Sequence, residues 1–116
     1  MIMTFLEKLA ASWVKNNSLL CVGLDPNIDM LPQHLLASKT PFFDFGKAII
    51  DATADQVCAF KPNSAFYEAR GAAGIEELKQ TCEYIRRQHS DIPIILDFKR
   101  GDIDTTNSHY DKFAFD

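Results

Sequence analysis

The chain has 116 residues, of which 47% are hydrophobic and 24% are charged, and its formal net charge is −4. This length allows one domain at most, and an acidic balance lacks the basic surface that nucleic-acid binding requires. No apolar run reaches the ~18 residues of a membrane span, and the N-terminus lacks the basic start and long apolar core of a signal peptide. Cys21, Cys58 and Cys82 show neither disulfide nor zinc-ligand spacing. We therefore expect a cytoplasmic protein that binds neither nucleic acid nor membrane.

Helices and strands are predicted to alternate along the chain. Thr4 and Glu7 form a capping box, and apolar residues three and four apart indicate the later helices. Short branched runs bounded by turn formers indicate buried strands, in which Cys21 and Cys58 would be small buried hydrophobes. We expect helices over 4–16, from Pro41, over 75–89 and from Thr105. We expect strands over 19–24, over 57–61 and from Ile92, and a turn over 65–68. Glu76 and Glu77 should lie at the positive end of the helix over 75–89. This alternation indicates a parallel sheet with right-handed crossovers.

Charged residues stand at the end of each predicted strand. Asp25 ends the first, Lys61 the second, and Asp97 and Lys99 the third. Because side chains two apart on a strand point the same way, these charges share one face of the sheet. Asp102, three residues beyond Lys99, is expected to fold back over the lysine. The same face should carry the small or branched residues that a barrel interior requires, namely Cys21, Gly23, Val57, Ala59 and Ile95.

In α/β folds, ligands bind at the carboxyl ends of strands. A solvated turn with weak surface ion pairs could produce one such strand end, but burying several charges without a polar ligand is costly. We therefore expect Lys99 to lie between Asp97 and Asp102 in a water-excluded pocket. Opposite charges ~4 Å apart attract by about 4 kcal/mol at an effective dielectric near 20. Such a lysine stays protonated, which suits a proton donor rather than a Schiff-base nucleophile.

Three stretches resemble the orotidine 5'-phosphate decarboxylase family, in its longer, bacterial-type branch. They are Val-Gly-Leu-Asp-Pro at 22–26, Phe-Lys-Pro-Asn-Ser-Ala-Phe-Tyr-Glu at 60–68, and Leu-Asp-Phe-Lys-Arg-Gly-Asp-Ile at 96–103, followed by Thr106. The resemblance covers the whole chain. It implies a (β/α)8 barrel that converts orotidine 5'-phosphate to uridine 5'-phosphate and carbon dioxide in pyrimidine synthesis. It also implies no metal, no organic cofactor, and a homodimer with both active sites at the subunit interface.

The resemblance implies a role for each strand-end residue. Lys99 resembles the proton donor to C6 of the pyrimidine, and Asp97 resembles the carboxylate that faces the departing group. Lys61 resembles the lysine that links this carboxylate to the ribose. Asp25 resembles a ligand of a ribose hydroxyl, and Asn63 resembles a further contact to the sugar.

Three further residues, Asp102, Ile103 and Thr106, resemble those that reach into the partner subunit's site. Asp102 completes a predicted catalytic set with Lys99, Asp97 and Lys61.

A complete barrel of this kind needs ~250 residues, and only three βα units are visible. We therefore expect residues 1–116 to be the N-terminal three βα units of a single TIM-barrel domain, preceded by a helix, and the isolated chain to be inactive. Two alternatives stay open. One is a related sugar-phosphate enzyme that uses magnesium. The other is an inactive half-barrel that acts only with a partner fragment.

Overall fold

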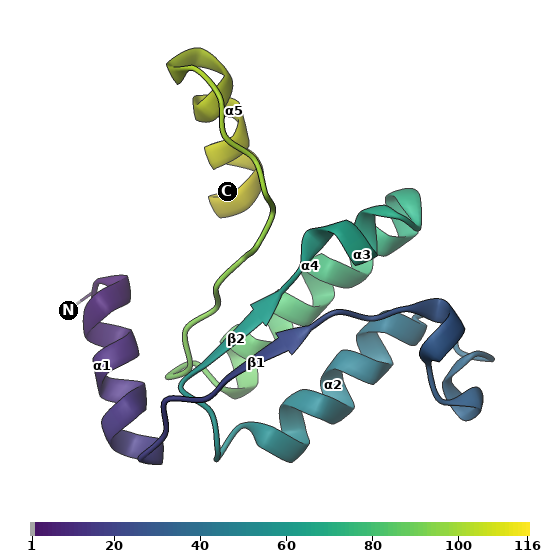
Figure 1. Ribbon diagram of the computed structural model, residues 1–116, viewed down its shortest axis with the longest axis horizontal. Coiled ribbons are helices and arrows are strands. Elements are labelled where there is room, and N and C mark those ends of the chain that lie inside the picture. The colour runs from purple at the N-terminus through teal and green to yellow at the C-terminus, as the bar shows by residue number, and fades with distance from the viewer. Residues whose placement is uncertain (1) are drawn as a thin grey trace.

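Two parallel strands, with helices packed on one side, form the centre of the molecule (Figure 1). The computed structural model describes residues 2–116. In chain order the elements are α1 (Phe5–Asn16), β1 (Cys21–Leu24), the 3-10 helices η1 (Ile28–Met30) and η2 (Gln33–Leu35), α2 (Pro41–Thr53), β2 (Ala59–Pro62), α3 (Ser64–Glu68), α4 (Gly71–Gln88) and α5 (Asp104–Phe115). α1 and α5 stand away from the sheet (Figure 1). No helix in this described part is long and apolar enough to cross a membrane.

The predicted capping box starts α1. The N–H of Thr4 donates to Glu7 Oε2 at 2.7 Å, and the N–H of Glu7 donates to Thr4 Oγ1 at 3.2 Å. At the other end of the helix, the Asn16 side-chain amide donates to the carbonyls of Ala54 and Val57, at 3.0 and 2.8 Å. These bonds hold the C-terminus of α1 beside the connection between α2 and β2.

The third predicted strand is present as two isolated parallel bridges, Phe60 with Ile94 and Asn63 with Asp97. The N–H of Asp97 donates to the Pro62 carbonyl at 3.0 Å. Pro62 has no N–H with which to return a bond, so the ladder is interrupted between the two bridges. The parallel order predicted for three strands is therefore observed, but within residues 2–116 only β1 and β2 form a regular sheet.

One face of the sheet packs under α2 and α4. Leu24 of β1 and Phe60 of β2 are at most 1% exposed, and they meet Ile50 of α2 and Ile85 of α4, which are fully buried. A second apolar cluster near the carboxyl ends of the strands combines Leu31, Phe42, Tyr67 and Leu78. These two clusters position α2 and α4 behind the strand ends that carry the charged residues.

The opposite face of the sheet is open apart from Ala59 of β2, which is 1% exposed. The sequence predicted a buried Cys21, but its side chain is exposed, because no other element among residues 2–116 covers β1 on this face. Cys58 is buried as predicted. Val57 was assigned to the open face, but it precedes the first residue of β2 and lies fully buried in the core. The pleat that governs a strand does not extend to this position.

α4 begins at Gly71, four residues before the predicted start at Ile75, and the predicted turn over 65–68 is the short helix α3. The two helices approach closely, because a Cβ at Gly74 would lie 1.8 Å from the carbonyl oxygen of Tyr67. Gly71 adopts φ +63° at the junction. Glycine lowers intrinsic helix propensity, so the glycines that allow this packing also concealed the start of α4.

Glu77 was assigned to the positive end of its own helix, but it instead caps the neighbouring helix α2. Its Oε2 accepts the N–H groups of Phe42 and Phe43 at 2.6 and 3.0 Å. Its other oxygen pairs with Arg70, and the residue is 2% exposed. Because α4 starts at Gly71, Glu77 lies in its second turn, where its side chain reaches the free N–H groups of α2.

Candidate active site

Asp97 lies between two lysine side chains. The Nζ of Lys99 is 2.5 Å from Asp97 Oδ2, and the Nζ of Lys61 is 3.6 Å from the same oxygen. The hydrogen bond from Lys99 is the main cause that lowers the pKa of Asp97 below its ordinary value of 3.8, and the positive charges of Lys99 and Lys61 lower this pKa further. The structure thus brings together three of the four predicted catalytic residues as one carboxylate and two ammonium groups.

Lys99 has a left-handed backbone, with φ +51°. This region is unfavourable for a residue that carries a Cβ. Non-glycine residues in such conformations cluster at functional sites, where the surrounding contacts hold them. The backbone conformation of Lys99 and its ion pair with Asp97 both indicate that Lys99 belongs to a functional site.

Asp25 and Asn63 form a second polar pair at the carboxyl ends of β1 and β2. The Asn63 side-chain amide donates to Asp25 Oδ2 at 3.3 Å. The Asn63 Oδ1 accepts the N–H of Ala65 at 3.3 Å, so this side chain also caps α3. Asn63 is the bridge partner of Asp97, which places the two polar groups next to each other. Both predicted sugar-binding residues therefore lie at the same edge as the lysines.

Asp102 does not fold back over Lys99. Within residues 2–116 it forms no ion pair with this lysine, and its Oδ1 accepts the N–H of Ile103 at 2.7 Å. Its carbonyl accepts the side-chain amide of Asn107 at 2.6 Å. The expected group of two carboxylates around one ammonium is wrong for this chain, because Asp102 belongs to the start of α5. Ile103 is 70% exposed, and Thr106 lies on the first turn of α5.

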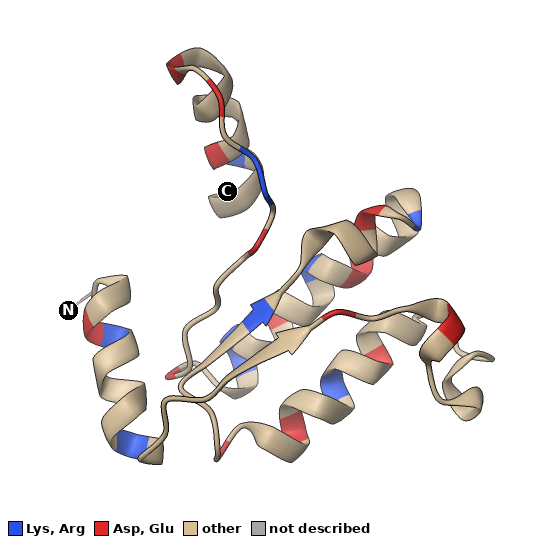
Figure 2. Ribbon diagram, viewed as in Figure 1, with Lys and Arg blue, Asp and Glu red and all other residues tan. Residues whose placement is uncertain are grey.

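The lysine cluster is open to water, contrary to the water-excluded pocket that we expected. The side chains of Lys99, Lys61 and Asp97 are 58%, 36% and 28% exposed. Figure 2 shows acidic and basic residues following one another along the bare segment that leads to α5. Solvent therefore weakens these ion pairs, because the part of the chain that the structure describes leaves their side chains exposed.

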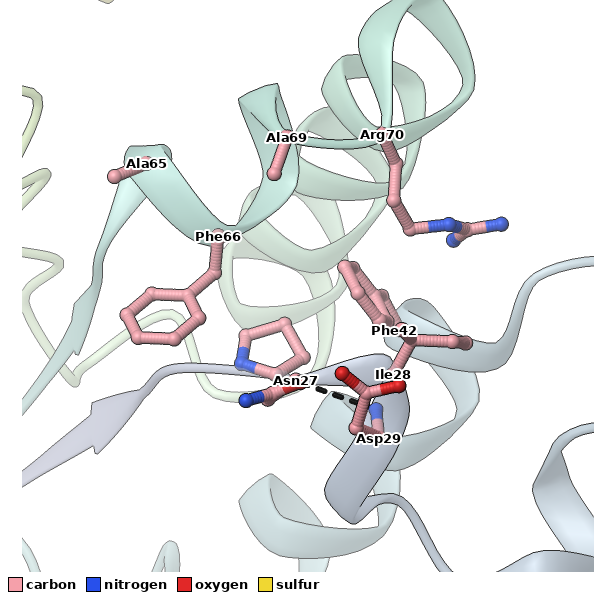
Figure 3. A pocket seen from close by; sticks show the side chains of 9 residues that line it. Asn27, Ile28, Asp29, Phe42, Ala65, Phe66, Ala69 and Arg70 are labelled. Carbon is pink, nitrogen blue, oxygen red and sulfur yellow. Dashed lines mark hydrogen bonds between the residues drawn. The ribbon is translucent and has the colours of Figure 1, made fainter.

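A separate cavity of about 450 Å³ lies between the β1–α2 connection and α3. The rings of Phe42 and Phe66 line it, and the guanidinium of Arg70 points outward over the Phe42 ring, 4.6 Å from the ring centroid (Figure 3). The cavity shares no lining residue with the lysine cluster. Its walls are mainly apolar, and its charged residues are Asp29 and Arg70 rather than a lysine–aspartate–lysine group.

Glu68 and Arg100 form an ion pair that the sequence analysis did not identify. Both residues stand inside the quoted motifs, at the end of 60–68 and directly after Lys99. The sequence did contain a signal for this pair, because the two opposite charges lie next to the ends of two neighbouring strands. Within residues 2–116, no group of three or more His, Cys, Asp or Glu side chains is arranged to hold a metal ion.

Parallel βα units that carry charged side chains at their carboxyl ends are typical of the α/β-barrel class of folds. Solved structures agree. A candidate orotidine-monophosphate decarboxylase from Toxoplasma gondii matches with a TM-score of 0.84 and 44% identity, over 93% of this chain and 36% of that one. The Leishmania donovani OMP decarboxylase matches with a TM-score of 0.78 and 34% identity, over 97% of this chain and 40% of that one. The chain therefore has the fold of the first βα units of a TIM barrel.

Residues 18–116 match the model of the Orotidine 5'-phosphate decarboxylase / HUMPS family, and the chain belongs to this family. The orotidine 5'-phosphate decarboxylase of Ralstonia nicotianae is 52% identical over 114 residues, which are 98% of this chain and 41% of that protein. The predicted resemblance is confirmed. The chain spans about two-fifths of the length of the curated relatives that it matches.

Proposed function

We propose that this chain contributes the proton-donating part of an orotidine 5'-phosphate decarboxylase, which forms uridine 5'-phosphate in de novo pyrimidine synthesis. Residues 1–116 would be the N-terminal part of a single TIM-barrel domain. The observation that carries the proposal is the contact of Lys99 and Lys61 with one carboxylate oxygen of Asp97, at 2.5 and 3.6 Å. The family and the level of identity supply the substrate.

In the proposed reaction, the bond between C6 of the pyrimidine and its carboxylate breaks, and the electron pair stays on C6. The Lys99 ammonium gives a proton to C6 as carbon dioxide leaves, and no redox partner is needed. A fixed cation beside the carbon stabilises the negative charge that develops there. Asp97 holds both ammonium groups in place, and Lys61 connects it to the ribose. Asp25 and Asn63 would bind the sugar hydroxyls.

The exposed residues at the start of α5 suit a role in a homodimer. Ile103 is 70% exposed, and Asp102 is also exposed, so both are free to contact a second subunit, together with Thr106. The proposed assembly is a homodimer in which each α5 start completes the partner's site. A cytoplasmic location is proposed with it, because the three cysteines are free thiols and a reducing compartment maintains thiols.

The test joins this chain to the remaining barrel segment of the Ralstonia nicotianae relative and follows conversion of orotidine 5'-phosphate by ultraviolet absorbance. We call this protein the hybrid barrel. It should turn over substrate, and Lys99→Ala should lower kcat at least about 10³-fold, since both the proton donor and its charge are lost. Lys79→Ala, which removes an exposed lysine of α4, is the matched control and should leave kcat unchanged.

Equal activity of the hybrid barrel and its Lys99→Ala variant would contradict the proposed function. The isolated chain should show no turnover. If mixing it with the separately produced remainder restores turnover, the half-barrel alternative holds. If turnover requires magnesium and a keto-sugar phosphate instead of the nucleotide, the sugar-phosphate alternative holds.

A further inference from the structure

The segment that carries Lys99 has few attachments to the rest of the molecule. Asp97 is fixed on both sides, because its N–H donates to Pro62 and its carbonyl accepts the N–H of Ser64, each at 3.0 Å. From Phe98 to Ile103 the chain forms no helix or strand. Within residues 2–116, the ion pair between Arg100 and Glu68 is the one polar contact of this segment with an element that precedes Asp97.

Arg100 spans Lys99 with its two terminal nitrogens. One of them, Nη1, donates to the carbonyl of Phe98 at 2.6 Å, and the other, Nη2, pairs with Oε1 of Glu68. The residue before Lys99 and the residue after it are therefore held by a single guanidinium. A planar fork of donors can serve two acceptors in this way, whereas an ammonium acts as a point charge.

Glu68 is a firm support for this guanidinium. Its second oxygen, Oε2, accepts the hydroxyl of Ser64 at 3.0 Å, so both carboxylate oxygens are engaged. Ser64 and Glu68 are the first and last residues of α3, and Asn63 caps this helix. Tyr67, next to Glu68, is fully buried. The carboxylate therefore stands on an element that the core holds in place.

We propose that Glu68 and Arg100 are positioning residues for Lys99, and that their ion pair clamps the turn from Phe98 to Arg100 so that the Lys99 ammonium stays on Asp97. Lys99 adopts φ +51°, a conformation that a free chain rarely populates for such a residue. The Arg100 bridge across the turn supplies a contact that holds it. The proposal rests on the proposed function for the role of Lys99, but the clamp itself is tested separately from activity.

The first test measures kcat and KM of the hybrid barrel with Glu68→Gln, Arg100→Gln and both changes together. Each single change should lower kcat about tenfold, because small displacements of a reacting group have large effects on rate. KM should stay within about twofold, since Asp25 and Asn63 are untouched. The double variant should be no worse than Arg100→Gln alone, because Glu68→Gln removes only the ion pair that Arg100→Gln already removes.

Two further variants separate positioning from general destabilisation. Arg100→Lys keeps the charge but not the fork, so its kcat should lie between those of Arg100→Gln and the unchanged hybrid. Arg87→Gln is the matched control, because Arg87 forms a comparable pair with Glu83 on α4, and it should leave kcat unchanged. If Glu68→Gln and Arg100→Gln behave like Arg87→Gln, the proposal is overturned.

The second test reads the contact of Lys99 with Asp97 without any turnover, by carbon NMR titration of the Asp97 carboxyl in the same proteins. Loss of the clamp should raise the pKa of Asp97 toward 3.8, since the Lys99 hydrogen bond is the main cause that lowers it. An unchanged pKa in both clamp variants would overturn the proposal, even with a lower kcat. If the unchanged hybrid does not decarboxylate the nucleotide, the proposed function fails and this titration alone decides the clamp.

Discussion

The two faces of the sheet differ in what covers them. On one face, Leu24 and Phe60 are at most 1% exposed beneath α2 and α4. On the other, Cys21 is exposed, and Ile95 is 36% exposed beside the charged strand ends. The covered face supplies the apolar burial that drives folding, whereas the open face supplies the lysines and carboxylates. The proposed chemistry therefore takes place on the exposed face of the sheet, and packing on the covered face holds its side chains in position.

The largest difference between the two faces is expected when one large side chain is removed from the covered face. Phe60→Ala should lower the free energy of unfolding by about 3–5 kcal/mol, because it leaves a cavity in a fully buried site. Urea denaturation followed by circular dichroism measures the change. Ile95→Ala, on the open face, is the control and should cost less than about 1 kcal/mol. Equal losses would show that the two faces are packed alike.

A smaller effect is expected from the carboxylate that joins the two covering helices. Glu77→Gln should lower the free energy of unfolding by about 2 kcal/mol, because it weakens two hydrogen bonds to α2 and leaves Arg70 without its charged partner. The same denaturation measurement applies. Glu83→Gln breaks an exposed pair with Arg87 on the same helix, and its effect should stay below about 0.5 kcal/mol. No difference between the two variants would contradict the capping role of Glu77.

The smallest expected effect concerns acid. The pKa of Asp97 is lower in the folded chain than its ordinary value of 3.8, so the unfolded chain binds a proton more readily. Asp97 therefore adds stability above that ordinary value, and the contribution is lost as the pH falls through its lowered pKa. Asp97→Asn should flatten the decline of stability in this window, measured by urea denaturation between about pH 5 and pH 2. An unchanged slope would mean that the lysines do not favour the charged carboxylate.

The sequence could predict the strand ends because hydrophobic runs and the residues that terminate them are local features. Asp25, Lys61 and Asp97 each follow a short apolar run, and the pleat alone assigns them to one side of the sheet. The family was predicted from the sequence motifs at three such strand ends, and the family model matches residues 18–116. Helix boundaries were less certain where glycine was needed for packing, as at Gly74.

The interruption of the third strand also has a local cause, the missing N–H of Pro62. It can be predicted only when the strand that pairs with Pro62 is known. Pro62 removes a ladder bond only because it lies opposite the segment after Ile92. The sequence alone does not say which strands are neighbours or in which register they pair. The loss of a hydrogen bond at Pro62 therefore could not be predicted.

By itself, the sequence determined the order of helices and strands, the charges at the strand ends, and the family. Only the tertiary structure decided that Glu77 caps α2, that Asp102 joins α5 rather than Lys99, and that Glu68 meets Arg100. The physical reason is that element type follows from neighbours along the chain. The contacts of Glu77 with Phe42 and of Glu68 with Arg100 join residues more than thirty apart, so they depend on how the elements pack. Asp102 lies close to Lys99 in sequence, but the direction in which the chain leaves the sheet decides which of its neighbours it contacts.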